Sequence, residues 1–206
     1  MSPDGKSSIQ FAFPGSSCSG LAWDGENVWV SDAADRKVLR VDPKDGHVLF
    51  SLAFEGDLGG VAWDGKHVWQ AERSSRTLSQ VDPDSGEIHK AIRVEHPMGD
   101  ISGLCHDGES LWVALTGIGQ IRRMKVVDGG YMKAYPTRPS VTGVAVVGKH
   151  LYYAEMDEGK VHKLDIPTGS LLVSYDVGGK PCGLCHDGKN FWLADADKKT
   201  VRCVRF

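Results

Sequence analysis

Hydrophobic and polar positions alternate along this chain in short segments that recur at a nearly constant interval. Each repeat opens with a segment of the type Gly-Leu-Ala-Trp-Asp-Gly. The glycines that open the five repeats are 40, 43, 40 and 40 residues apart, and they are Gly20, Gly60, Gly103, Gly143 and Gly183. A fixed period of this length indicates one structural unit per repeat.

Four strands are predicted in each repeat. In the first repeat, an Asp-Gly turn at 24–25 follows the opening segment, and a Pro/Asp/Gly cluster at 42–46 separates the third strand from the fourth. No segment longer than a turn has helical periodicity with caps. These features predict an all-β five-bladed β-propeller with four-stranded antiparallel blades. We expect one tryptophan position of the second strand to be buried between blades, and its residues are Trp29, Trp69, Trp112 and Trp192.

The fifth repeat lacks its fourth strand, and the chain begins with a strand that belongs to no repeat, at 8–13. We predict that this N-terminal strand completes the fifth blade, which closes the ring and removes an exposed sheet edge. The alternative is half of a larger ring that a second chain completes. The first reading gives a single domain over 1–206, with blades at about 20–54, 60–94, 103–135, 143–177, and 183–206 plus 8–13.

Charge and composition limit the kinds of partner that we expect for this chain. The chain has 24 basic and 27 acidic residues, a net charge of −3, and no basic run, so we expect no nucleic-acid partner. Its apolar runs are shorter than a membrane span, and its first residues lack the apolar core of a secretory signal. We therefore expect a cytoplasmic monomer without membrane contact. Five cysteines at irregular spacing do not indicate a disulfide framework, and reduced thiols are the simpler reading.

The second strand ends in an acidic residue in four of the five repeats, and in Leu115 in the remaining one. Equivalent strands of a ring end on one face, where the loops between blades vary most, so this face is the expected binding site. One hypothesis is a ligand site, or a site for Ca²⁺, Mg²⁺ or Zn²⁺, because hard cations take several oxygen ligands. The alternative is that each carboxylate caps its own turn. The four residues are Asp32, Glu72, Glu155 and Asp195.

Cysteine and histidine offer further candidate chemistry. Cys105-His106 and Cys185-His186 occupy one repeat position and could bind a metal or act in nucleophilic catalysis. They replace alanine and an aromatic ring of other repeats, which favours packing instead. Cys18 and Cys182 belong to blades that become neighbours on closure, so they could hold a soft metal, form a disulfide, or be unrelated. His162 shares its repeat position with no other histidine.

The repeat Gly-Leu-Ala-Trp-Asp-Gly-x-x-Val-Trp-Val-x-Asp, with a later strand that ends in Val-Asp-Pro-x-x-Gly, resembles the NHL and YVTN type of propeller repeat. It is similar to the repeats of streptogramin lyases and propeller-type glutaminyl cyclases. The resemblance covers nearly the whole chain, and it implies a fold rather than an activity.

A binding propeller is the function that we expect first, with a small-ligand, ion or protein site at the loop-rich mouth. The alternative is an enzyme similar to a glutaminyl cyclase or a streptogramin lyase. By resemblance of segment 69–82 to the cyclases, Glu72 would be the general acid/base. The loop that follows Glu72 is shorter than theirs and lacks their glycines and tyrosine, and the lyases have more blades.

Overall fold

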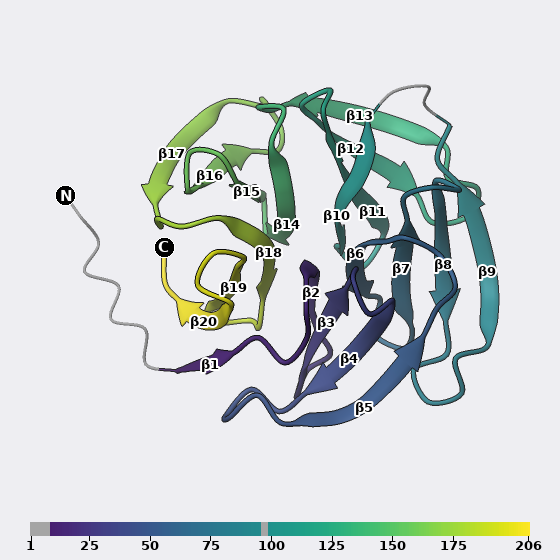
Figure 1. The fold of residues 1–206 in the computed structure, drawn as a ribbon. Helices are drawn as coiled ribbons and strands as arrows, with labels where there is room; N and C mark the ends of the chain where they lie inside the picture. The colour runs from purple at the N-terminus through teal and green to yellow at the C-terminus, as the bar shows by residue number, and fades with distance from the viewer. Residues whose placement is uncertain (1–8, 96–98) are drawn as a thin grey trace.

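The computed structural model describes residues 9–95 and 99–206, which form strands joined by turns (Figure 1). The strands make five four-stranded antiparallel sheets around a ring, so the chain is an all-β five-bladed propeller as predicted. No described residue lies in a helix, and so none of them belongs to a helical segment that could cross a membrane.

The two inner strands of each blade carry most of the buried residues. The innermost strands line the axis of the ring, and they are β2 (Cys18–Trp23), β6 (Leu58–Trp63), β10 (Asp100–His106), β14 (Val141–Val147) and β18 (Pro181–His186). The second strands pair with them, and they are β3 (Val28–Asp32), β7 (Val68–Glu72), β11 (Ser110–Thr116), β15 (His150–Glu155) and β19 (Phe191–Asp195).

The two outer strands of each blade are more exposed. The third strands are β4 (Lys37–Val41), β8 (Thr77–Val81), β12 (Gln120–Lys125), β16 (Lys160–Asp165) and β20 (Thr200–Val204). The outermost strands are β5 (Val48–Ala53), β9 (Ile88–Arg93), β13 (Tyr131–Pro136), β17 (Leu171–Asp176) and β1 (Gln10–Ala12).

Closure of the ring follows the prediction from the sequence. Strand β1 is the outer strand of the fifth blade and pairs antiparallel with β20, with Phe11 opposite Val201. In Figure 1 this purple strand lies beside the yellow C-terminal one. Phe11 is 5% exposed, and its ring centroid lies 6.0 Å from that of Trp192. Ser8, the first residue of the predicted strand, lies outside the described residues.

The opening glycines of the five repeats face one another around the axis. A Cβ added to Gly20 would lie 2.8 Å from the Cα of Gly60, and one added to Gly60 would lie 2.8 Å from the Cα of Gly103. Real Cβ atoms are never that close to backbone, so these strands can approach only without side chains. The inner ladder of every blade also shifts register next to this glycine, as at a β-bulge.

A hydrogen bond inside four of the five blades explains the paired Asp and Trp of the repeat. The Asp of the first turn accepts the indole N–H of the second strand at 2.7–3.0 Å in four blades. The fourth blade has Val147 and Tyr152 at these two positions, so both partners change together. The four tryptophans are at most 3% exposed, which confirms their predicted burial.

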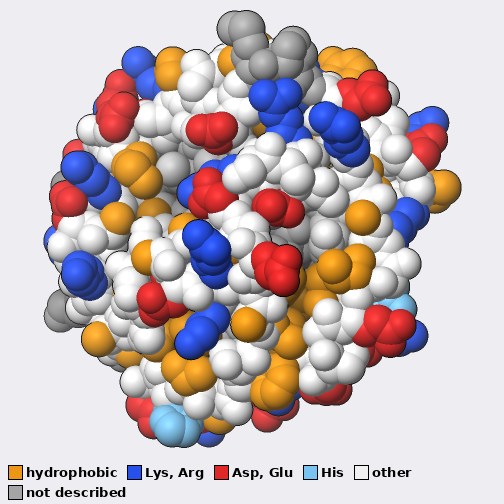
Figure 2. Space-filling model, turned by 45° about the vertical axis from the view of Figure 1, so that its right-hand side comes forward, with side chains coloured by type: hydrophobic (Ala, Val, Ile, Leu, Met, Phe, Trp, Pro, Cys, Tyr) orange, Lys and Arg blue, Asp and Glu red, His pale blue; other side chains and the backbone are white. Residues whose placement is uncertain are grey.

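Charged side chains of both signs are interspersed on the face drawn in Figure 2, and hydrophobic side chains appear between them. This face therefore has no extended field of one sign that would steer a strongly charged partner.

Gly103→Ala should destabilise the ring because its new Cβ would meet the Thr142 carbonyl of the next blade. We expect a loss of more than about 3 kcal/mol in the free energy of unfolding, at the upper end for overpacking. Gly130→Ala is the matched control, because its Cβ meets only side chains, 2.9 Å from the Asp128 carboxylate at the nearest. It should change stability by less than about 1 kcal/mol. Equal urea midpoints for the two variants would contradict the axial constraint.

Candidate functional site

Asp32 joins the two loops of its blade on the face where the second strands end. Its carboxylate accepts the backbone N–H of Ser16 at 2.7 Å and of Ser17 at 2.9 Å, in the loop that enters the blade. It also accepts the N–H of Ala34 at 3.1 Å, in the turn after β3. Asp32 is 1% exposed, so these bonds replace the water that an ionised carboxylate needs.

Asp195 and Glu155 make equivalent contacts in their own blades. Asp195 accepts the N–H of Lys180 and of Lys198, each at 3.2 Å. Burial acts to raise the pKa of Asp195, but these bonds and the Lys198 ammonium at 3.6 Å outweigh it, so the pKa is lowered. Glu155 accepts the Ser140 hydroxyl and, at 2.8 Å, the N–H of Glu158.

These three carboxylates are thus arranged as turn caps, the alternative that the sequence left open. The cation site on all four strand-ending acids stays a prediction, since each carboxylate lies with the loops of its own blade.

Glu72 differs from these three acids in being only half-buried, and it accepts the Ser75 hydroxyl at 2.9 Å. Like Asp32 and Asp195, it packs against a loop glycine, here Gly56, where a Cβ would overlap the carboxylate. It also lines a groove of about 450 Å³ between the first and second blades. Apolar side chains from both blades form part of the wall, among them Phe54, Leu58 and Ile88.

Gln70 lines the same groove and is 2% exposed. It lies two residues before Glu72 on β7, so the two side chains point to the same face of the sheet. Its amide nitrogen donates to the carbonyl oxygens of Ala71 at 2.7 Å and Gly59 at 3.3 Å. The Oε1 atom is buried without a hydrogen-bond partner. A buried acceptor left without a partner is uncommon, and it suits a ligand donor.

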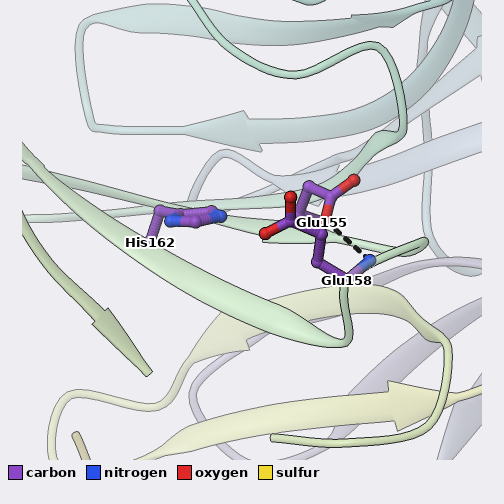
Figure 3. A group of neighbouring side chains, drawn as sticks. All are labelled: Glu155, Glu158 and His162. Atoms are coloured by element: carbon purple, nitrogen blue, oxygen red, sulfur yellow. Dashed lines mark hydrogen bonds between the residues drawn. The ribbon is translucent and has the colours of Figure 1, made fainter. Parts of the chain in front are cut away.

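The fourth blade holds a group of ligand atoms that the four-acid hypothesis does not describe. Glu155, Glu158 and His162 each place one possible metal-ligand atom within 4.8 Å of the others (Figure 3). Sequence reasoning singled out Glu155 and missed the other two. The signal for His162 was its lack of a counterpart in the other repeats, since the fold did not require a histidine there.

The Cys-His pairs lie beside an axial cavity on the opposite face. This cavity measures about 80 Å³ and is lined by residues of all five innermost strands. Burial raises the pKa of Cys105 to about 12 and also raises that of Cys185, so both thiols stay protonated and are poor nucleophiles. His106 accepts the N–H of Gly108 at 3.2 Å, and His186 accepts that of Gly188 at 3.1 Å. These contacts favour the packing role.

Cys18 and Cys182 lie in contact where the first and fifth blades meet. Cys182 is 3% exposed, and Cys18 is half-buried against the same hydrophobic cluster. Two effects raise the pKa of Cys182: the larger is a hydrogen bond with Cys18, and the smaller is burial. Both cysteines are free thiols in this structure, and a soft-metal role for them stays a prediction.

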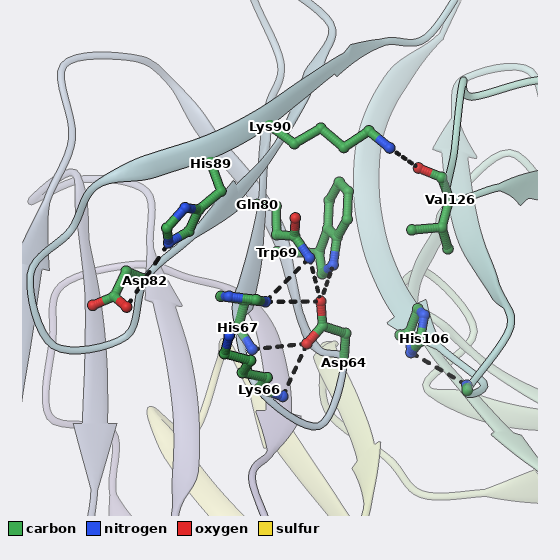
Figure 4. A network of polar contacts seen from close by, with 11 residues as sticks. Asp64, Lys66, His67, Trp69, Gln80, Asp82, His89, Lys90, His106 and Val126 are labelled. Atoms are coloured by element: carbon green, nitrogen blue, oxygen red, sulfur yellow. Dashed lines mark hydrogen bonds and ion pairs between the residues drawn. The ribbon is translucent and has the colours of Figure 1, made fainter.

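A polar network around Asp64 occupies the tight turn of the second blade (Figure 4). Asp64 accepts the side-chain amide of Gln80 at 2.6 Å, the indole of Trp69 at 2.9 Å and the N–H of His67 at 2.7 Å. Burial acts to raise the pKa of Asp64, but these donors outweigh it and lower the pKa to about 2. This carboxylate therefore stays ionised as a structural acceptor.

Comparisons with known proteins establish the fold only. No family model and no curated protein sequence matches the chain. Among solved structures, it is similar to Myxococcus xanthus glutaminyl cyclase, with a TM-score of 0.80, 13% identity, and coverage of 98% of this chain and 95% of that one. It is also similar to Kuenenia stuttgartiensis hydrazine synthase, with a TM-score of 0.59, 14% identity, and coverage of 92% and 95%. The fold is shared. Proteins this different in sequence can share a propeller and differ in activity.

Asp64→Asn should change the pH dependence of stability. Since the folded-state pKa of Asp64 is about 2 and its ordinary value is 3.8, its contribution is present above pH 3.8 and is lost as the pH falls toward 2. The variant should be less stable than the wild type at pH 7, and the difference should narrow between pH 4 and pH 2. Urea midpoints across that range test this, with Glu26→Gln, an exposed residue, as the control. A constant difference down to pH 2 would disprove the assignment.

Proposed function

We propose that this protein is a ligand-binding propeller whose site is the groove between the first and second blades. The observation that carries the proposal is Gln70, which lines a groove together with Glu72 and has a buried Oε1 without a hydrogen-bond partner. Two acceptors from one strand face favour a ligand with N–H donors, such as an amine or a primary amide. The volume of about 450 Å³ is in the range of small-molecule pockets.

The chemistry of the walls narrows the ligand further. An ionised carboxylate accepts hydrogen bonds and favours a cationic head group. Phe54, Leu58 and Ile88 favour an apolar body beside that head group. The proposed ligand is therefore a small amphipathic amine, and short peptides with a free N-terminus are members of this class.

A glutaminyl cyclase-like enzyme is the second candidate, favoured by the place of Glu72 in the groove and the shared fold with the Myxococcus cyclase. In such a reaction the N-terminal amine attacks the side-chain amide carbon and ammonia leaves. Glu72 would take a proton from the amine and return it to the departing nitrogen. The substrate carries an N-terminal amine and a side-chain amide, and their N–H groups suit the acceptors of Gln70 and Glu72 in the groove.

Binding of a glutaminyl dipeptide amide, measured by calorimetry, tests the first proposal. We expect Glu72→Gln to weaken binding about 10- to 100-fold, because a hydrogen bond to a charged group contributes about 1.5–3 kcal/mol. Gln70→Leu should weaken it about tenfold. Glu26→Gln, on the opposite face, is the matched control and should leave the affinity unchanged. The N-acetylated peptide, which lacks the ammonium group, should bind more weakly than the free one.

Ammonia release from the same peptide separates the two candidates. Release that Glu72→Gln abolishes, with the fold intact by circular dichroism, supports the cyclase. Binding without release supports the ligand-binding propeller. If neither binding nor release occurs, or if Glu72→Gln and Gln70→Leu bind like the wild type, the groove is not the site.

A further inference from the structure

Three potential metal ligands meet where the second and third strands of the fourth blade join, away from the proposed groove. Glu155 ends β15, Glu158 lies in the turn that follows, and His162 lies on β16. The hairpin folds these residues together, so that one donor atom from each lies within 4.8 Å of the other two (Figure 3). Glu155 is 1% exposed and His162 is 5% exposed, so two of the three donors are inside the protein.

The imidazole of His162 is held with one nitrogen occupied and the other without a partner. Its Nδ1 lies 2.8 Å from the Ser174 hydroxyl, on the neighbouring strand β17. Its Nε2 is buried and has no hydrogen-bond partner. In a metal-binding histidine, one ring nitrogen usually makes a hydrogen bond that fixes the ring, and the other ring nitrogen binds the metal.

The repeat does not account for this histidine. The cross-strand register places His162 opposite Tyr153, whose ring centroid lies 4.8 Å from that of the histidine. The corresponding positions of the other blades are occupied by Leu39, Ser79, Arg122 and Arg202. Since the fold accepts such different residues there, a buried histidine with an open nitrogen needs a local reason.

Two basic residues form ion pairs with Glu158. Arg138 lies 3.0 Å from one carboxylate oxygen and Lys160 lies 2.8 Å from the other. Both cations are partly exposed, at 60% and 37%, so they can turn toward water when a divalent ion takes their place. The two carboxylates and a divalent ion then form a neutral set, which suits a buried position.

We propose that Glu155, Glu158 and His162 form a binding site for a first-row divalent transition metal, with Zn²⁺ as the representative ion. One imidazole nitrogen with two carboxylates is a donor set for Zn²⁺ and its neighbours, whereas Ca²⁺ takes six to eight oxygen ligands. Three protein ligands leave a fourth position open to water or to a ligand group. The site is thus a second functional centre on the loop-bearing face.

Metal binding to the chelator-treated full-length protein tests the proposal. In competition with a chromophoric chelator, we expect one Zn²⁺ per chain and a rise in the melting temperature, because the ion binds only the folded state. His162→Gln and Glu158→Gln should each weaken Zn²⁺ binding at least tenfold. Glu158 is a partly exposed turn residue, so this second variant keeps the test valid if the histidine variant is unstable.

Two controls separate this site from other ligands of the chain. His47→Gln changes an exposed histidine on a distant turn and should leave Zn²⁺ binding unchanged. Co²⁺ absorption distinguishes the donors, since a nitrogen and oxygen set lacks the intense thiolate-to-metal band that ligation by Cys18 and Cys182 would produce.

Specific outcomes would overturn the proposal. It fails if the chelator-treated chain takes up no Zn²⁺, Co²⁺ or Mn²⁺, or if His162→Gln binds these ions like the wild type. It also fails if Asp32→Asn or Asp195→Asn abolishes binding while His162→Gln does not, because the ion would then belong to the other strand-ending acids. A thiolate band in the Co²⁺ spectrum would assign the ion to the cysteines.

Discussion

The contact between inner-strand backbones at the axis is the constraint on which the rest of this ring depends. Five blades can close around a centre this small only if the innermost strands approach without side chains. Gly20, Gly60 and Gly103 provide that approach, and Gly143 and Gly183 continue it to the fifth blade. Hydroxyls before these glycines then link neighbouring blades, as where Ser19 donates to the Gly59 carbonyl at 2.9 Å and Ser102 to the Val141 carbonyl at 2.7 Å. The axis is thus closed by backbone contacts and hydrogen bonds.

A closed axis determines where a ligand can bind. The cavity that remains at the centre measures about 80 Å³, which is large enough for water but too small for an organic molecule of ordinary size. The strand-ending carboxylates at the other face hold their own loops, as the bonds of Asp32 show. A groove of organic-molecule size lies instead between the first and second blades, where Gln70 has a buried acceptor without a partner. His162 has a buried nitrogen without a partner in the fourth blade.

The sequence predicted the fold well because repetition makes its requirements visible. Five equivalent glycines, Asp-Gly turns and a missing last strand were enough to predict the blades and their closure by β1. The paired Asp and Trp of four repeats were also visible, but the bond between them required the cross-strand geometry. The change of both partners in the fourth blade, to Val147 and Tyr152, was the available signal for that bond.

The candidate sites were harder to predict for the same reason that the fold was easy. A residue that recurs in every repeat is explained by the blade, so the acids that drew attention include several turn caps. Gln70 and His162 occur once each, and their chemistry depends on register: Gln70 lies opposite Ser79, and His162 opposite Tyr153. Sequence alone does not show that one amide oxygen or one imidazole nitrogen is left without a partner after folding. In a repeat protein, a buried polar residue that departs from the repeat is therefore a better candidate for a site than a polar residue that recurs.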